Sequence, residues 1–404
     1  MTRTEPPDLV HVCDWLPPDF GAVGQYAEIA TRERAFRGES VVLVGLTSGR
    51  GEVVAERIGL GRRLTVRLSA ARYDRSRLGR RLLWTVATNT RLLLAALPHM
   101  RRARMVTFTG SPPLFLHWIA LANLLLRRPL TYRITDFHPE CLIAGRGGRA
   151  GLCLKAVLAL TWFWRRRIDR FEVVGRDQIA RLTAGGVPPE RIVLARDRSP
   201  LPAGDPARPA PRPPGTEGRR LLLYSGNLGY AHDTGTFLDG YRRHHREGSG
   251  RVLLWLNATG QRAEPLRAAL RRDGLPFVDG APVPIGRLAS LLLAADAHLV
   301  TLAAGFEGLV MPSKVYAAID SGRPILFVGR AASDVHALCI EAGVPSYRRA
   351  EPGDCAAVAA ALEALATAPA GSPAIAPARP LVLADRESPA LVAAGAATLG
   401  HTGP

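Results

Sequence analysis

The residues with the clearest chemical potential lie in the stretch Gly305–Gly329, which reads GFEGLVMPSKVYAAIDSGRPILFVG. Pro312, Ser313 and Lys314 precede an apolar run that stops at Gly322, the usual pattern of a helix start and end. A helix start favours an anion, because its free N–H groups and its dipole are positive there. Lys314 is one of only two lysines in a chain that otherwise uses arginine, which favours a compact cation at this point. We predict that this stretch holds the phosphates of a nucleotide; a solvated lysine at a helix start is the alternative.

A second set of small polar residues follows the apolar run 221–225, in the segment YSGNLGYAHD. Its candidate ligand contacts are Ser225, Gly226, Asn227, Gly229 and His232. The next apolar run ends at Asn257, in the sequence NATG. Small hydrogen-bonding loops at successive strand ends suit a nucleotide, so we expect these residues to share the phosphate site.

A third set follows the apolar run 130–135, where Asp136, His138 and Glu140 stand at alternate positions of RITDFHPE. General acid–base chemistry or contact with sugar hydroxyls is the functional interpretation of Asp136 and His138. A capped helix start is the alternative. The local sequence offers no further ligand for a metal, so we expect none.

The first glycine loop, Gly21-Ala22-Val23-Gly24, lies between an apolar run and a helix that we expect to begin at Gln25. Glycine lets the backbone approach a ligand closely, which predicts an acceptor or phosphate loop at Gly21, Gly24 and Gln25. The loop lacks the third glycine and the acidic residue of a dinucleotide-binding motif. A tight turn without a ligand is the alternative.

Apolar strand-like runs alternate with helical segments twice along the 404 residues. This order predicts an α/β protein with two doubly wound parallel-sheet domains, residues 1–199 and 219–370. Residues 200–218, rich in Pro and Gly, read as a linker, and residues 371–404 read as an Ala- and Pro-rich tail with a candidate helix at 389–399 returning to the first domain. Parallel sheets bind ligands at the carboxyl ends of their strands, so we expect a cleft between the two domains.

The formal charge of +18 is uneven, with +16 on residues 1–200 and +2 on residues 201–404. Such a basic half implies an anionic partner. Its arginines are scattered and no aromatic residues interleave with them, which argues against nucleic acid. Two apolar segments, 114–126 and 152–164, each end at an arginine cluster and are too short to span a bilayer. We predict contact with an anionic membrane surface; helices packed on the sheet are the alternative.

Five cysteines without a paired spacing argue against a zinc site and a disulfide framework. The beginning MTRTEPPDLV does not read as a signal peptide. We therefore expect a cytoplasmic protein, peripheral at the inner face of the membrane, with no cofactor.

Taken together, YSGNLG, PSKVYAAIDSGRPI, the glycine loop and the DFHPE block resemble bacterial GT-B glycosyltransferases of the family-4 kind. More narrowly, they resemble the PSK-motif branch that builds exopolysaccharide or lipid-linked glycans. The resemblance covers roughly residues 8–366. It implies a retaining, metal-independent hexosyltransferase whose second domain binds a nucleotide sugar and whose first domain binds a glycan or lipid-linked acceptor.

The resemblance also implies roles for single residues. Gly226, Asn227 and Gly229 would lie near the diphosphate. The region from Glu307 through Gly308 and Leu309 to Lys314 would lie near sugar, diphosphate and ribose. Asp136, His138, Glu307 and Lys314 are the candidate catalytic residues.

The chain departs from the family in two places. The two glutamates usual in this family would fall at Leu309 and Ala317, and the basic pair usual after the first glycine turn is replaced by Tyr230-Ala231-His232-Asp233. Two other functions remain open: a sugar-nucleotide epimerase on the same fold, and a basic polyanion-binding protein.

Overall fold

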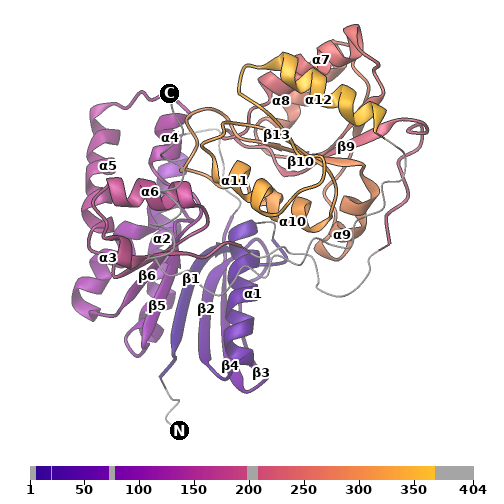
Figure 1. Cartoon of the computed structure of the whole chain (residues 1–404). Coiled ribbons are helices and arrows are strands. Elements are labelled where there is room, and N and C mark those ends of the chain that lie inside the picture. The colour runs from indigo at the N-terminus through magenta and orange to yellow at the C-terminus, as the bar shows by residue number, and fades with distance from the viewer. Residues whose placement is uncertain (1–5, 20, 72–77, 198–207, 369–404) are drawn as a thin grey trace. The chain divides into compact units, whose positions relative to one another are not determined.

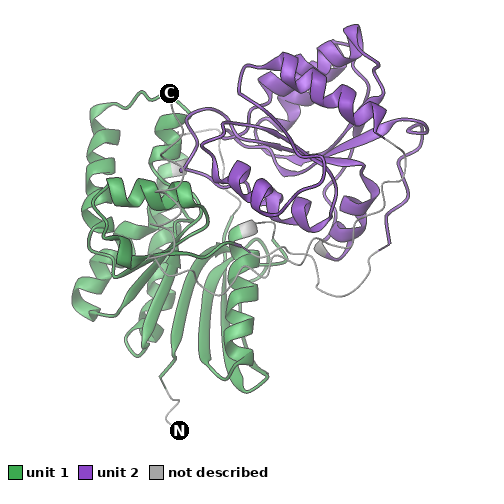
Figure 2. Cartoon of the chain, viewed as in Figure 1, with its two compact units in different colours: residues 1–196, 386–404 green, residues 197–385 purple. Residues whose placement is uncertain are grey.

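The structure, a computed structural model, describes residues 6–19, 21–71, 78–197 and 208–368. The chain divides into two compact units, unit 1 up to Arg196 and unit 2 from Asp197 (Figure 2). Each unit is a parallel-sheet α/β body, as the sequence predicted, and each is described by itself. The cleft between them stays a prediction. The predicted tail and its candidate helix lie outside the described residues.

Unit 1 contains an eight-stranded sheet in the order β3-β4-β2-β1-β5-β6-β7-β8. Its strands are β1 (Leu9–Trp15), β2 (Ser40–Thr47), β3 (Glu52–Ile58), β4 (Gly61–Ser69), β5 (Met105–Thr109), β6 (Leu130–Ile134), β7 (Arg170–Val173) and β8 (Ile192–Leu194). All neighbours are parallel except β3 and β4, which form an antiparallel pair at the edge. Apart from this edge pair, the sheet is the doubly wound parallel sheet that the sequence predicted, and β3 is a largely exposed strand without a continuous apolar run.

Helices cover both faces of this sheet (Figure 1). They are α1 (Ala22–Phe36), α2 (Leu78–Met100), α3 (Phe115–Leu126), α4 (Glu140–Ala144), α5 (Leu152–Arg165), α6 (Arg176–Ala184) and the short 3₁₀ helix η1 (Pro189–Arg191). On the α1 side, Ala27 packs with Cys13 and Leu43. On the other face, Phe115 of α3 meets Phe108 of β5 edge-on.

Unit 2 contains a six-stranded, wholly parallel sheet in the order β11-β10-β9-β12-β13-β14. The strands are β9 (Arg220–Asn227), β10 (Val252–Thr259), β11 (Phe277–Asp279), β12 (Ala297–Thr301), β13 (Ile325–Val328) and β14 (Arg348–Ala350). The helices are α7 (Gly235–Glu247), α8 (Ala263–Arg272), α9 (Ile285–Ala294), α10 (Lys314–Asp320), α11 (Asp334–Glu341) and α12 (Cys355–Thr367).

Two apolar clusters bury the two faces of the unit 2 sheet. On one face, side chains of α7, α8 and α12 pack against alternate residues of β9 and β10, among them Leu222 and Leu254. On the other face, α9 and α10 pack against the intervening residues, among them Leu221 and Leu253 (Figure 1). Both faces of the central strands are buried, which explains their nearly continuous apolar sequences.

Each sheet has a point at which the chain reverses its direction of winding. In unit 1 this point lies between β1 and β5, and in unit 2 between β9 and β12. Open parallel sheets bind ligands beyond the carboxyl ends of the strands at such a point. The two reversal points therefore indicate where functional side chains should gather.

The described part of the predicted linker, residues 208–218, lies against unit 2. The Ala210 amide donates to the Ser290 carbonyl of α9 at 2.8 Å, and Arg212 pairs with Asp296 at 3.1 Å. No helix among the described residues is both long and apolar enough to cross a membrane.

Candidate functional site

A polar cluster centred on Lys314 lies at the reversal point of unit 2. Lys314 is the first residue of α10, and its Nζ donates to the Tyr224 hydroxyl at 2.7 Å and to His232 Nε2 at 3.3 Å. The Tyr224 hydroxyl in turn donates to the Asn227 carbonyl at 3.0 Å. The cluster therefore joins the end of β9, the loop after it and the start of α10, three segments that the sequence predicted to share one site.

The hydrogen bonds fix the protonation state of His232. Its Nδ1 lies 2.8 Å from the Thr301 carbonyl, which can only accept, so Nδ1 carries the proton and Nε2 is an acceptor. The pKa of His232 lies well below its usual value, first because the ring is buried and then because it faces the charge of Lys314. A neutral imidazole thus orients the Lys314 ammonium without balancing its charge.

Lys314 is a cation in neutral surroundings. Burial lowers the pKa of its ammonium from the usual 10.5 to about 7. Within the described ranges, no carboxylate lies at ion-pair distance from the Lys314 Nζ, whereas nearby arginines of the same unit, such as Arg267 and Arg271, each have a carboxylate within 4.0 Å. Its two hydrogen-bond partners are a hydroxyl and an imidazole nitrogen. An anion placed beside this group would restore its charge, so the cluster has the chemistry of an anion site.

Gly226 brings the backbone of β9 beside this lysine. Its φ of +125° is a conformation that side-chain-bearing residues rarely adopt. A Cβ built on it would lie 3.6 Å from the Lys314 Cε, an ordinary contact, so the backbone conformation explains the glycine. The structure thus brings Gly226 and Lys314 together, and their contact with a ligand stays a prediction.

The loops after β9 and β10 are bound to each other. The Leu228 amide donates to the Thr259 carbonyl at 2.6 Å, and the Arg262 amide donates to the Leu228 carbonyl at 2.9 Å. A Cβ on Gly260 would come within 2.3 Å of the Asn227 side-chain oxygen. Asn227 therefore has a structural contact within the unit, and its predicted phosphate contact stays a prediction.

The remaining predicted donor residues surround this cluster at different depths. Ser225 and Asn257 are register partners in β9 and β10, and Asn257 is buried. Leu309 is buried and Gly308 has a φ of +68°. Gly229 lies next to the Asn227 amide. Ser313 immediately precedes α10, but its side chain makes no capping hydrogen bond.

Glu307 does not contact Lys314. One of its oxygens accepts from the Gly305 amide at 2.8 Å, and the other lies 3.7 Å from the Arg330 Nε. Ala317, at the position of the family's second glutamate, belongs to the apolar cluster on the α9 side of the sheet. A glutamate side chain at this position would leave the backbone inside an apolar cluster, so alanine fits the local packing better.

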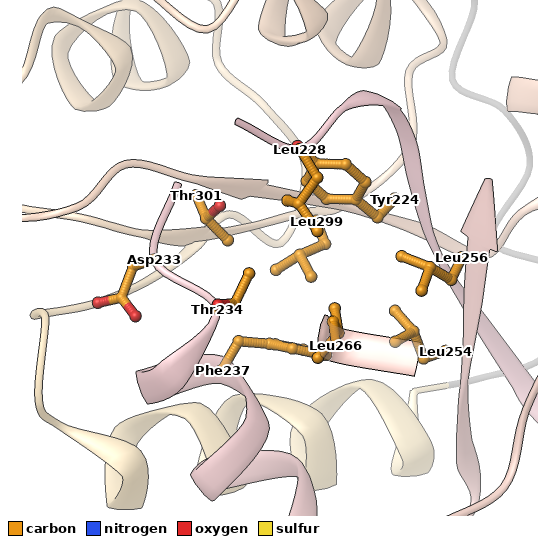
Figure 3. Close-up of a pocket in the computed structure, with 10 residues that line it drawn as sticks. All are labelled: Tyr224, Leu228, Asp233, Thr234, Phe237, Leu254, Leu256, Leu266, Leu299 and Thr301. Carbon is orange, nitrogen blue, oxygen red and sulfur yellow. The ribbon is translucent and has the colours of Figure 1, made fainter. Parts of the chain in front are cut away.

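Beneath the Lys314 cluster lies a small cavity between β9, β10, β12, α7 and α8 (Figure 3). It measures about 10 Å³, the volume of about one water molecule. Leucine side chains and Phe237 line most of it, while the Asp233 carboxylate stands at its margin (Figure 3). It is a gap in the apolar packing and is too small for a nucleotide.

Unit 1 carries its own polar cluster at its reversal point. Asp14, at the end of β1, accepts a hydrogen bond from the Ser111 hydroxyl, which follows β5, at 2.6 Å. Burial raises the pKa of Asp14 to about 6, and its second oxygen is buried without a partner in the described structure. A Cβ on Gly110 would lie 3.4 Å from the Asp136 carbonyl, which brings the loop after β6 beside this pair.

Asp136 and His138 thus lie at the same sheet edge as Asp14 and Ser111. Burial lowers the pKa of His138, so its ring is neutral near pH 7. Asp14 and Ser111 were not predicted from the sequence, because neither belongs to a motif. The order of the strands is the signal that brings them together.

Glu140 has a structural role behind this loop. It forms a buried ion pair with Arg165 of α5, whose guanidinium also donates to the His138 carbonyl at 3.0 Å. Arg165 lies between the rings of Phe137 and Trp162, at 4.9 and 4.8 Å from their centroids. The expectation that Arg165 belongs to a surface cluster is therefore wrong, because this residue is fully buried.

The first glycine loop is shorter than predicted, since α1 begins at Ala22 and includes Gly24 and Gln25. A Cβ on Gly24 would fall 1.7 Å from the Trp15 carbonyl oxygen. Helix packing against the end of β1 thus requires this glycine, whereas Gly21 has room for a Cβ. Ligand contact at these residues stays a prediction.

The five cysteines all lie in the described part of the chain and are free. Among the described residues, no group of three or more His, Cys, Asp or Glu side chains could hold a metal ion. The predicted absence of a metal and of a cofactor is not tested by this finding.

Comparison with known proteins gives a weak sequence signal and a clear fold. No protein-family profile matches the chain. WbjE of Pseudomonas aeruginosa, a probable glycosyltransferase, is 24% identical over 251 residues, which span 60% of this chain and 62% of that protein. The matched segment is therefore less than two thirds of its relative.

Solved structures resemble the chain over nearly its whole length. Anabaena HepE, solved in complex with UDP and glucose, covers 98% of this chain and all of its own at a TM-score of 0.60 and 12% identity. WaaG, a glycosyltransferase involved in lipopolysaccharide biosynthesis, covers 98% of this chain and all of its own, at a TM-score of 0.58 and 14% identity. An α,α-trehalose-phosphate synthase from Burkholderia vietnamiensis covers 89% of this chain and 92% of its own, at a TM-score of 0.57 and 14% identity. The chain has the GT-B fold of these proteins, with two Rossmann-like domains.

Proposed function

We propose that this protein is a glycosyltransferase that moves a sugar from a nucleotide-sugar donor to a glycan or lipid-linked acceptor. The observation that carries the proposal is Lys314, a partly buried cation with a hydroxyl and a neutral imidazole as partners at the reversal point of unit 2. The fold likeness to UDP-bound HepE and the partial likeness to WbjE support the same class.

In this reaction an acceptor hydroxyl attacks the anomeric carbon of the donor. The carbon–oxygen bond to the diphosphate breaks, a new glycosidic bond forms, and the hydroxyl proton leaves the acceptor. Negative charge grows on the departing nucleoside diphosphate, and a preoriented ammonium stabilises it most where water is excluded. Lys314 has the position and the chemistry for this role. We propose retention of the anomeric configuration and a reaction without a metal, as the family resemblance implies.

The acceptor side is assigned to unit 1. Its reversal point carries Asp14, Ser111, Asp136 and His138, which can bind hydroxyl groups and hold a proton. The largely neutral His138 and the Asp14 carboxyl with its raised pKa are suited to hydrogen bonding with a sugar.

We propose that unit 1 works at the inner face of an anionic membrane. Helices α3 and α5 present Leu125 and Leu152, each more than four-fifths exposed, together with exposed Arg127, Arg166 and Arg167. Apolar side chains beside arginines suit an acidic lipid surface. Flotation with phosphatidylglycerol vesicles should recover the wild type, and Leu125→Asp should reduce recovery several-fold. Leu60→Asp, at an exposed leucine between β3 and β4, is the matched control.

A thermal-shift panel of UDP-, GDP-, ADP- and dTDP-sugars tests the central assignment. One nucleotide class should raise the melting temperature of the wild type and of Lys155→Met, which changes the chain's other lysine, and should leave Lys314→Met unshifted. Stabilisation by none of the four would contradict the transferase. Conversion of the donor sugar to an epimer in the absence of an acceptor would favour a sugar-nucleotide epimerase. Salt-sensitive binding of any polyanion would favour a basic polyanion-binding protein.

A further inference from the structure

The loop that follows β10 carries polar side-chain atoms without partners. The side-chain oxygens of Asn257 and Gln261 and the Nε of Arg262 are buried, and no hydrogen-bond partner for them exists in the described structure. Asn257 is 97% buried, with an exposed fraction of 3%. Buried polar atoms are usually paired. Of these three, only the Arg262 Nε is a donor that an anion can satisfy, because the two amide oxygens accept and need a donor such as a hydroxyl.

Arg262 is held close to the Lys314 cluster. It stands immediately before α8, and its amide donates to the Leu228 carbonyl at 2.9 Å. Leu228 begins the loop that carries His232, the residue that contacts Lys314 at 3.3 Å. The positive charge of Arg262 also acts on His232, where it contributes to the lowered pKa of the ring.

Other arginines of α8 have acidic partners. Arg267 and Arg271 both bind Asp279, at 2.6 and 2.8 Å. Arg262 has no ion pair or side-chain hydrogen bond with any described residue. Arg262 is therefore a second cation without a carboxylate partner, near Lys314.

We propose that Arg262 is a second cationic ligand of the donor diphosphate, opposite Lys314. This inference rests on the proposed function and names the residue that supplies the second positive charge. A guanidinium can bind two phosphate oxygens at once, while the lysine acts as a point charge, so the pair can hold a diphosphate in one orientation.

The test compares Arg262→Gln with Arg271→Gln, which removes an equal charge from the same helix at a residue that has its own partners. Binding of UDP, GDP, ADP, dTDP, inorganic pyrophosphate and uridine is measured by calorimetry on the full chain. Arg262→Gln should weaken the preferred nucleoside diphosphate and pyrophosphate about 10- to 100-fold. Arg271→Gln should bind like the wild type. Arg262→Lys should keep part of the affinity, and circular dichroism should show all variants folded.

The outcomes separate the two proposals. If the wild type binds no nucleoside diphosphate, the proposed function fails and this inference fails with it. If the wild type binds one and Arg262→Gln binds it equally well, only the assignment of Arg262 is overturned. If Arg262→Gln loses affinity for the nucleoside but binds pyrophosphate as well as the wild type, the assignment of Arg262 as a diphosphate ligand is also overturned.

Discussion

The pKa of Lys314 predicts how nucleotide binding depends on pH. With a value of about 7 in the free protein, about half of the lysine is protonated at pH 7, about a tenth at pH 8 and about a hundredth at pH 9. A bound diphosphate stabilises the ammonium and raises this pKa, so binding takes up a proton above pH 7. Uptake should be about 0.5 proton per site at pH 7 and about 0.9 at pH 8.

The affinity for the preferred nucleoside diphosphate should therefore fall about 50-fold from pH 7 to pH 9. Calorimetry in buffers of different ionisation enthalpy measures both the affinity and the proton uptake. The terminal phosphate titrates near pH 6, so it is about nine-tenths ionised at pH 7 and nearly fully ionised from pH 8 upward. Lys314→Arg keeps its charge up to pH 9 and should show neither uptake nor slope. A wild-type affinity that is constant between pH 7 and pH 9 would refute the assignment of Lys314 as a phosphate ligand.

The same pKa makes a prediction for stability without ligand. Because the folded pKa lies below the unfolded 10.5, the charged lysine destabilises the fold below pH 7, and this cost disappears as the pH rises toward 10.5. Lys314→Met should raise the free energy of unfolding at pH 7 by up to about 4 kcal/mol. Urea unfolding should show a smaller difference in the free energy of unfolding between Lys314→Met and the wild type at pH 10 than at pH 7.

Two further predictions concern unit 1. Arg165→Met leaves its carboxylate partner buried and unpaired and should cost about 3–5 kcal/mol in urea unfolding, whereas Lys155→Met, at an exposed position of the same helix, should change stability by less than about 0.5 kcal/mol. Equal losses of stability in Arg165→Met and Lys155→Met would contradict a stabilising role of the buried ion pair. Gly24→Ala forces a Cβ into a backbone oxygen and should prevent normal folding, while Gly21→Ala, with a nearest contact of 3.6 Å, should melt close to the wild type.

The sequence predicted the elements that have a strong apolar period. The apolar run 130–135 and the apolar segment 152–164 agree within one residue with β6 (Leu130–Ile134) and α5 (Leu152–Arg165), because apolar runs bounded by turn residues are specific. The exposed edge strand β3, the three-residue β14 and the short helices α4 and α11 were missed, since none carries such a run.

The candidate site was predictable where motif and fold coincide. Gly226, His232 and Lys314 were expected to converge, and the structure brings them together. Asp14 and Ser111 are 97 residues apart, so only the order of the strands could pair them. The burial of Arg165 depends on which side of α5 faces inward, a detail that three consecutive arginines obscure.

The buried pair of Glu140 and Arg165 has a consequence for protein engineering. It fixes the segment from Asp136 to Arg165 as one transferable module, because the loop with His138 and the outer helix α5 share an internal charge balance. A chimera that grafts α5 from a homologue without this loop would bury an unmatched ion. On the proposed assignment of the acceptor to unit 1, an exchange of acceptor preference between homologues should therefore succeed when residues 136–165 move together, with a crossover on either side of that block.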